Sequence, residues 1–311
     1  MKKKLVIVFF AITAIGLITC KGLEKLFALT EEKITSVQTS SPLEKFYTAM
    51  GNYSVQSVKY PANDNNLKEF TVYYPETVQA GQKFPLVVMV NGSGVATSKY
   101  EAVLKHLASW GFVVIGSEEE SSWSGKGASQ SLDFALKLNS DKNSPVYQKI
   151  DADKIGVAGH SQGGVGVINA VNNHANGKLY RSVYGVSTTK HPLAEFLKWP
   201  YDVSKITIPY FAVAGAGASD AGDGKDRNTG IAPLWSMQEN YDNLPQNTPA
   251  VIAQRKDQEH GAMLYVPNGY MVAWFLYTLN NDTKAKGVFA GNNPEIKSNG
   301  NWQEVKIKNL K

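Results

Sequence analysis

The sequence predicts an α/β fold with a mainly parallel, twisted sheet and helices on both faces. Short apolar runs alternate with longer stretches in which apolar residues recur every three or four positions, and this alternation is typical of parallel strands joined by helices. The run from Pro85 to Val90 is almost entirely apolar, as expected for a strand covered on both faces. With 311 residues, 43% of them hydrophobic, the chain is long enough to bury such a sheet.

The expected elements begin near residue 50. Strands at 53–60 and 69–74 are joined by a polar turn and form an antiparallel hairpin. The elements expected after the hairpin are a strand at 85–90, a helix at 99–110, a strand at 112–116, a helix at 130–138, a strand at 154–158, a helix at 162–171, strands at 181–186, 209–214 and 250–254, and a closing helix at 269–279. In such a sheet, reactive residues belong at the carboxyl ends of the strands.

The first twenty residues resemble an export signal. Three lysines follow Met1, and residues 5–18 form an apolar run of fourteen residues, which is shorter than the roughly twenty that span a bilayer. The only cysteine, Cys20, follows Leu17-Ile18-Thr19. This pattern resembles a bacterial lipobox, whose cysteine is lipidated and becomes the first mature residue, although Thr19 stands where that pattern has Gly, Ala or Ser. The alternative is a simple signal peptide that has a cysteine near its end.

The predicted organisation therefore has three parts. They are a signal segment at 1–20, a mixed polar tether at 21–45 that lifts the body from a membrane, and a single folded domain at 46–311. We expect an exported monomer, either secreted, periplasmic or held at a membrane only through a lipid on Cys20.

The net charge of the chain excludes one class of partner. The formal charge is +5, and the three lysines near the N-terminus supply three of these charges. The remaining charge of +2 is too small to indicate nucleic-acid binding. A single cysteine also cannot close an intrachain disulfide.

The stretch Gly159-His160-Ser161-Gln162-Gly163 carries the strongest chemical signal. It fits the G-x-S-x-G pattern, in which a serine lies on a strained turn between a strand and a helix. The two glycines lack the side chains that would keep strand and helix apart. Since a strand is expected before the pattern and a helix after it, Ser161 is the candidate nucleophile.

A serine hydroxyl needs a histidine base, which in turn is oriented by a carboxylate. In folds with this turn, the acid and then the base follow the serine along the chain. His260 follows the strand expected at 250–254 and precedes the closing helix, so it is the predicted base. The other histidines lie before the turn, in it, at the end of the following helix or in an irregular segment: His106, His160, His174 and His191.

The acid is expected just past the strand at 209–214. The loop at 215–223 offers Asp220 and Asp223, and Asp220 is preferred because it is nearer the strand end. Both remain open, because aspartates in glycine-rich loops are often turn formers.

Acyl transfer also requires donors for the developing oxyanion. One candidate is the backbone N–H of Gln162, the residue after the nucleophile. The other belongs to the turn Asn91-Gly92-Ser93-Gly94, which follows the strand at 85–90. The amide of Ser93 is preferred, with that of Gly94 second, and the alternative is a turn without a catalytic role.

Taken together, these stretches resemble the α/β-hydrolase superfamily and, within it, the secreted esterases, lipases and cutinase-like polyester hydrolases. The resemblance covers about residues 50–285 and rests on segments 91–94, 107–115, 157–164, 259–261, 273–277 and 281–283. It implies that Ser161 is the nucleophile, His260 the base and Asp220 the orienting acid, with the amides of Ser93 and Gln162 as the oxyanion hole.

Two features of the chain depart from the polyester hydrolases. Those proteins commonly carry a C-terminal disulfide, which a chain with one cysteine cannot form. They also have a methionine after the nucleophile, where this chain has Gln162.

Aromatic residues give the only indication of substrate preference. Trp123 follows a strand end and could stack on an acyl or aromatic group of the substrate. Trp199 and Tyr201 lie in segment 188–206, where such folds place a cap. That segment is short for a lid, which favours an open cleft. Each aromatic residue could equally serve only in packing.

The sequence therefore predicts an exported serine hydrolase that cleaves small-molecule, lipid or polyester carboxylic esters through an acyl-enzyme intermediate, with 46–311 as its catalytic domain. No metal or organic cofactor is expected, because the chain has no H-E-x-x-H pattern and no paired histidine–carboxylate cluster. The alternatives are a peptidase or acyltransferase with the same triad, and a catalytically silent, lipid-tethered binding protein.

Overall fold

A nine-stranded sheet forms the centre of the computed structural model, which describes residues 29–76, 79 and 81–310. The strands are β1 (Val55–Pro61), β2 (Glu69–Pro75), β3 (Phe84–Val90), β4 (Val113–Ser117), β5 (Ile150–His160), β6 (Tyr180–Val186), β7 (Tyr210–Gly215), β8 (Ala250–Arg255) and β9 (Trp302–Lys308). Their order across the sheet is β1-β2-β4-β3-β5-β6-β7-β8-β9. Each neighbouring pair from β4 to β8 is parallel, while β1, β2 and β9 pair antiparallel at the edges.

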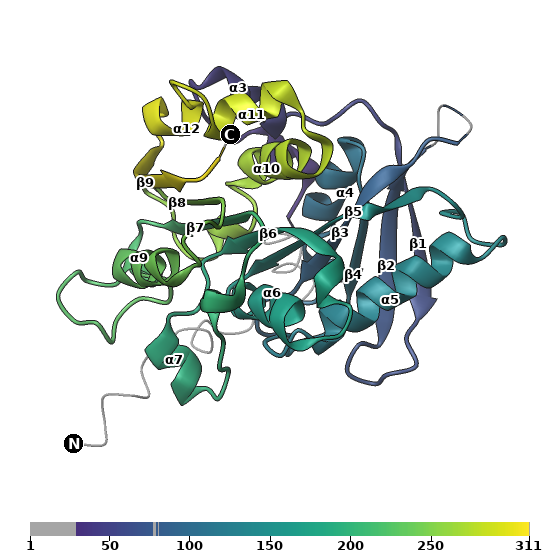
Figure 1. Cartoon of the computed structure of the whole chain (residues 1–311), viewed down its shortest axis with the longest axis horizontal. Coiled ribbons are helices and arrows are strands. Elements are labelled where there is room, and N and C mark those ends of the chain that lie inside the picture. Colours follow the sequence, from purple (N-terminus) through teal and green to yellow (C-terminus); the bar gives the residue numbers. More distant parts are fainter. Residues whose placement is uncertain (1–28, 77–78, 80, 311) are drawn as a thin grey trace, which may run out of the picture.

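Helices and short 3-10 turns connect the strands (Figure 1). The helices are α2 (Glu31–Thr35), α3 (Pro42–Thr48), α4 (Glu101–Ser109), α5 (Lys126–Ser140), α6 (Gln162–Asn173), α7 (His191–Phe196), α8 (Ala218–Ala221), α9 (Leu234–Asn243), α10 (Asn268–Asn280), α11 (Thr283–Phe289) and α12 (Glu295–Ser298). The 3-10 turns are η1 (Thr97–Lys99), η2 (Gly177–Leu179), η3 (Val203–Lys205) and η4 (Ala262–Leu264).

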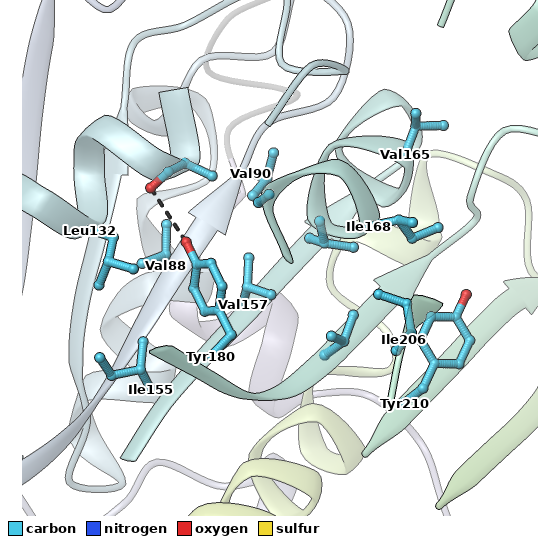
Figure 2. Packing of buried hydrophobic residues seen from close by; sticks show 14 of the residues in the cluster. Val88, Val90, Leu132, Ile155, Val157, Val165, Ile168, Tyr180, Ile206 and Tyr210 are labelled. Carbon is cyan, nitrogen blue, oxygen red and sulfur yellow. Dashed lines mark hydrogen bonds between the residues drawn. The ribbon is translucent and has the colours of Figure 1, made fainter. Parts of the chain in front are cut away.

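Two apolar layers lie on opposite faces of the sheet, because successive side chains of a strand point to opposite sides. In β3, Val88 and Val90 pack into the layer with α5, α6 and α9, whereas Val87 and Met89 pack into the layer with α4, α10 and α11. Figure 2 shows the first layer, where Val165 and Ile168 of α6 lie over the central strands. Each fully buried aliphatic side chain contributes roughly 1.5–3 kcal/mol. The predicted parallel sheet with helices on both faces is confirmed.

Most predicted elements occur within a few residues of their expected bounds, but β5 is longer than expected and the edge strand β9 was not anticipated. The sequence of β9 mixes lysines with apolar residues, and its pairing with β8 changes register between Ile252 and Gln254. A positive φ of 53° at Glu304 accompanies this irregularity. The interruption disturbs the strict alternation by which a half-buried strand is recognised.

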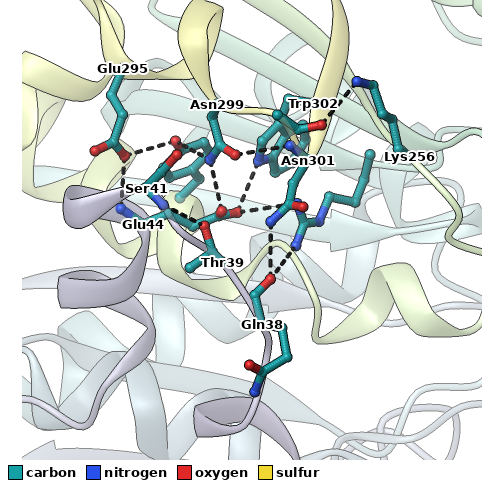
Figure 3. A network of polar contacts seen from close by, with 12 residues as sticks. Gln38, Thr39, Ser41, Glu44, Lys256, Glu295, Asn299, Asn301 and Trp302 are labelled. Atoms are coloured by element: carbon teal, nitrogen blue, oxygen red, sulfur yellow. Dashed lines mark hydrogen bonds and ion pairs between the residues drawn. The ribbon is translucent and has the colours of Figure 1, made fainter.

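The expected tether does not hold for residues 29–45, because they form part of the folded body. Ile34 of α2 and Glu44 of α3 are buried, and the Leu43 and Glu44 amides donate to the Glu295 carboxylate at 2.6 and 2.8 Å. Figure 3 shows Gln38 and Glu44 among residues near the C-terminus. These partners lie more than 200 residues away in the sequence, so no local pattern indicates the contact.

The predicted signal segment at 1–20, including Cys20, and the tether up to residue 28 lie outside the described residues. Within the described part of the chain, no helix is both long and apolar enough to cross a bilayer.

Candidate active site

Ser161 lies between β5 and α6, where the chain turns sharply. Its backbone has φ 60° and ψ −118°, a strained conformation for a residue with a side chain. The Ser161 amide donates to the Val186 carbonyl of β6 at 2.8 Å, which holds the turn against the neighbouring strand. A Cβ atom added to Gly159 would overlap the Gly163 carbonyl, and one added to Gly163 would overlap the Val90 carbonyl. The turn therefore requires both glycines.

The side chains of Ser161, His260 and Asp220 form a continuous chain of hydrogen bonds. His260 Nε2 lies 2.9 Å from Ser161 Oγ, and His260 Nδ1 lies 2.6 Å from Asp220 Oδ1. An ionised carboxylate only accepts hydrogen bonds, so Nδ1 carries the proton and Nε2 is free to accept from the serine hydroxyl. The Asp220 side chain is fully buried, whereas that of His260 is 17% exposed. The ring is thus accessible at the surface while its partner is shielded from water.

Asp220 receives two further hydrogen bonds that satisfy its buried charge. Its Oδ2 accepts from the Ser187 hydroxyl at 2.5 Å and from the Gly215 amide at 2.8 Å. Asp223 lies instead in an exposed turn, where its Oδ1 accepts from the amides of Lys225 and Asp226, each at 2.9 Å. These backbone hydrogen bonds, that of Asp226 first, lower the pKa of Asp223. Of the two candidate acids, the structure brings Asp220 to His260.

His160, the residue before the serine, supports the His260 loop. Its Nε2 lies 2.9 Å from the His260 carbonyl oxygen, and the two rings lie 4.5 Å apart between centroids. A carbonyl oxygen can only accept, so His160 donates from Nε2. Burial, and next the neighbouring His260, lower the pKa of His160 to about 3, so its ring remains neutral near pH 7. The remaining histidines have other partners: His106 bonds Ala49 and Asn268, His174 bonds Ser124, and His191 stacks on Tyr201.

The turn after β3 lies directly beside the nucleophile. A Cβ on Gly92 would be 3.6 Å from the Ser161 Cβ. The buried Asn91 side chain fixes the turn by donating to the Ser117 and Glu119 carbonyls at 2.7 and 2.8 Å. The Gly94 amide already donates to the Glu120 carbonyl at 3.1 Å. The Ser93 amide has no such acceptor within the described residues, which leaves it available to a ligand.

The Gln162 side chain reaches the loop between β4 and α5. It is buried, and its Oε1 accepts from the Ser122 amide at 2.8 Å. The Ser122 hydroxyl donates in turn to the Asn91 carbonyl. Gln162 therefore joins the serine turn to the loop that carries Trp123 and, through Ser122, to the turn after β3. As the first residue of α6, its own amide has no partner within the helix.

The three aromatic candidates for substrate binding differ in their surroundings. Tyr201 is buried and stacks on His191, with ring centroids 3.9 Å apart. Trp199 and Trp123 are half-buried and pack against the layer under α5 and α6. The Trp123 carbonyl accepts from the Asn169 side chain of α6 at 2.8 Å. Tyr201 therefore serves in packing, and Trp123 remains the candidate for substrate binding, because its neighbour Ser122 is hydrogen-bonded to Gln162.

No group of three or more His, Cys, Asp and Glu side chains within the described residues is arranged to hold a metal ion. Sequence reasoning missed the supporting residues Ser187, Ser219 and Glu259, which contact the Asp220 and His260 loops. The one sequence feature that could have indicated these residues is their position next to a candidate residue or at the end of a strand.

A family model described as PET hydrolase-like matches residues 37–306, which include strands β1 to β8, most of β9, the serine turn and the His260 loop. The chain belongs to the PET hydrolase-like family. Membership confirms the predicted α/β-hydrolase fold. The matched region begins at residue 37, within the segment that packs on the body.

One curated relative supports the same family assignment. The chain is 25% identical over 231 residues to a protein named cutinase est1 from Thermobifida alba. The alignment covers 69% of this chain and 66% of that protein, so the chain spans just under two thirds of its relative's length.

Proposed function

We propose that the protein hydrolyses carboxylic esters through an acyl-enzyme intermediate on Ser161, with His260 as the base and Asp220 as the orienting acid. The observation that carries the proposal is the unbroken chain from Ser161 Oγ to His260 Nε2 at 2.9 Å and from His260 Nδ1 to Asp220 at 2.6 Å. These distances are within the range of nucleophile–base and base–acid hydrogen bonds in serine hydrolases.

In the first half of the reaction, Ser161 Oγ attacks the ester carbonyl carbon while its proton passes to His260 Nε2. The carbonyl oxygen becomes an oxyanion, which the amides of Ser93 and Gln162 stabilise. The buried Asp220 carboxylate stabilises the imidazolium and keeps its orientation. His260 then gives the proton to the departing alkoxide, so the ester C–O bond breaks, the alcohol leaves and the acyl group stays on Ser161.

The second half repeats these transfers with water. His260 Nε2 takes a proton from water, whose oxygen attacks the acyl carbon. The proton then passes to Ser161 Oγ as the carboxylic acid leaves. Overall, one ester and one water molecule give one alcohol and one carboxylic acid.

The substrate class follows from the family and from the wall of the site. The family description and the name of the curated relative point to polyester-like and cutin-like esters. Trp123 is our proposed contact for the acyl group, and the hydrogen bond from the neighbouring Ser122 amide to the Gln162 side chain supports this role. The methionine of polyester hydrolases is replaced by a glutamine that is turned into the protein, so we expect soluble esters to be better substrates than a polymer film.

Export and anchoring are proposed on the sequence alone. Residues 1–20 would act as the signal, Cys20 would carry a lipid, and the body would act as a monomer without metal or cofactor. Metabolic labelling with a fatty acid tests this proposal, since a Cys20→Ser variant should lose the label.

The central test uses a fluorophosphonate probe, which reacts with an activated serine. The full chain should be labelled and should hydrolyse p-nitrophenyl esters, and the Ser161→Ala variant should do neither. A folded wild-type protein that is neither labelled nor active would refute the proposal. Esters of graded chain length and a polyester film would then define the substrate.

A further inference from the structure

Glu259, the residue before His260, ties the His260 loop to the loop that carries Asp220. Its Oε1 accepts from the Ala218 amide at 3.1 Å, and its Oε2 accepts from the Ser219 amide at 2.8 Å. The Ser219 hydroxyl also donates to Oε2. Ala218 and Ser219 are the first two residues of α8, and Asp220 is the third. A single carboxylate thus holds the segment that contains the acid.

The Ser219 hydroxyl extends this contact to His260. A hydroxyl has one proton, and since Ser219 donates it to Glu259, its lone pairs are left to accept. They accept from the His260 amide at 2.7 Å. Glu259 therefore orients the hydroxyl that holds the backbone of His260. Hydrogen bonds from Ser219, first through its side chain and then its backbone, lower the pKa of Glu259, so the carboxylate is ionised near pH 7.

Backbone contacts on both sides complete the connection between the two loops. The Gly217 amide donates to the Gln258 carbonyl at 2.8 Å, and the Ala216 amide donates to the Arg255 carbonyl at 2.9 Å. The His260 carbonyl accepts from His160 at 2.9 Å. A chain with one cysteine cannot join these loops by a disulfide. Hydrogen bonds therefore supply the restraint: those of the backbone, and those that Glu259 and Ser219 make.

We propose that Glu259 and Ser219 are positioning residues, which hold the His260 ring at the distance from Ser161 and Asp220 that the reaction needs. The expected effect on the rate of ester hydrolysis rests on the proposed function. Neither side chain reacts with substrate in the mechanism above. Their effect is through His260, and a displacement of about 1 Å at a reacting group can lower a rate on the order of 100-fold.

The test compares Glu259→Ala, Glu259→Gln and Ser219→Ala with Asp257→Asn in the full chain. Asp257→Asn removes one negative charge from the same loop. Asparagine also tolerates the positive φ of 56° at that position. Asp257→Asn therefore controls for the loss of charge, since it keeps the contact of Glu259 with Ala218 and Ser219.

With a soluble p-nitrophenyl ester, Glu259→Ala should lower kcat roughly 10- to 100-fold and leave KM within about twofold, because the substrate contacts remain. Glu259→Gln keeps one acceptor oxygen and should fall between Glu259→Ala and wild type. Ser219→Ala should lower kcat by a factor similar to that of Glu259→Ala. The variant that combines Glu259→Ala with Ser219→Ala should have a kcat only a little lower than either single variant, since both residues act through one contact. Asp257→Asn should match wild type.

A second readout does not depend on turnover. The proton on His260 Nδ1 is held in a short hydrogen bond, and it should give a downfield proton resonance that a His260→Gln variant lacks. The resonance should persist in Asp257→Asn and broaden or disappear in Glu259→Ala, measured at a temperature where both are fully folded.

These readouts separate two failures. An unchanged resonance with unchanged kcat in Glu259→Ala would overturn the positioning role. A lowered melting temperature with resonance and kcat retained would also overturn it, because Glu259 would then only stabilise α8. A wild-type protein without labelling or ester hydrolysis would refute the proposed function, and the resonance would still decide whether Glu259 positions His260.

Discussion

Asp220 shows how a single buried carboxylate is held beside the base. Its carboxylate has no exposure to solvent, yet it receives hydrogen bonds from His260, Ser187 and Gly215. A buried charge is costly unless it is paired and hydrogen-bonded. These donors therefore make the position tolerable for an ion and orient both carboxylate oxygens.

At the residue scale, we predict that Asp220→Asn lowers kcat by about 10³- to 10⁴-fold. An asparagine amide can place a donor against Nδ1 and stabilise the wrong histidine tautomer. The measurement is ester turnover, with circular dichroism to verify folding.

Asp223→Asn is the matched control. Its side chain lies in an exposed turn, so activity should stay near that of wild type. Equal activity in Asp220→Asn and wild type would reject Asp220 as the acid.

At the scale of elements, the serine turn depends on how closely β5 and α6 approach β3. We predict that Gly163→Ala lowers the melting temperature and abolishes ester turnover. The new Cβ would overlap the Val90 carbonyl in the backbone of β3, and overpacking of this kind costs about 1–3 kcal/mol or more. Gly300→Ala is the control, because no atom lies within 4 Å of its added Cβ. A melting temperature of Gly163→Ala equal to that of Gly300→Ala would contradict the prediction.

His106 joins three helical elements through a neutral ring. On α4, its Nε2 lies 2.9 Å from the Ala49 carbonyl after α3, and its Nδ1 lies 2.6 Å from the Asn268 side-chain nitrogen at the start of α10. Nε2 therefore donates and Nδ1 accepts. Burial lowers the pKa of His106 from 6.5 to about 4, because a charged ring is poorly solvated inside the protein.

We predict that the free energy of unfolding falls as the pH falls from about 6.5 to about 4. In this window the unfolded chain binds a proton at His106 and the folded chain does not, so the contribution is present above pH 6.5 and is lost towards pH 4. The slope from one such group is at most about 1.4 kcal/mol per pH unit. Urea titrations at several pH values measure it.

His106→Gln provides the comparison for the pH series. This variant should be less stable at pH 7, but its free energy of unfolding should change less steeply with pH. The pH dependence that remains would arise from groups such as His160. An identical slope in His106→Gln and wild type would show that His106 does not contribute.

At the scale of the whole molecule, the N-terminal segment is part of the fold. Glu44 is buried, with Oε1 3.8 Å from Arg255 and 2.9 Å from the Trp302 indole nitrogen. Its Oε2 accepts from Asn299 at 2.7 Å. Figure 3 shows these contacts between α3 and the C-terminal residues. The two ends of the described chain are thus joined by one buried carboxylate.

We predict that Glu44→Ala lowers the free energy of unfolding by about 3–5 kcal/mol, because it leaves the buried Arg255 guanidinium without its charge partner. A chain that starts at residue 46 should be destabilised at least as much. Chemical denaturation measures both, with the exposed Glu32→Ala as a control. A loss below about 1 kcal/mol in Glu44→Ala would show that the pair contributes little.

The sequence by itself determined the α/β class, the serine turn and the order of the candidate residues along the chain. These features are local, since strand length, helix periodicity and the glycines around Ser161 are readable within a dozen residues. The choice of Asp220 over Asp223 was only a preference, because both lie in one glycine-rich loop.

Only the tertiary structure decided which residues meet across long separations. It brought Asp220 rather than Asp223 to His260, turned the Gln162 side chain into the β4–α5 loop, and packed residues 29–45 onto partners more than 200 positions away. Glu259 reaches the acid loop across 40 residues. No periodicity or motif encodes such contacts, because they depend on how buried polar groups find partners once the sheet has formed.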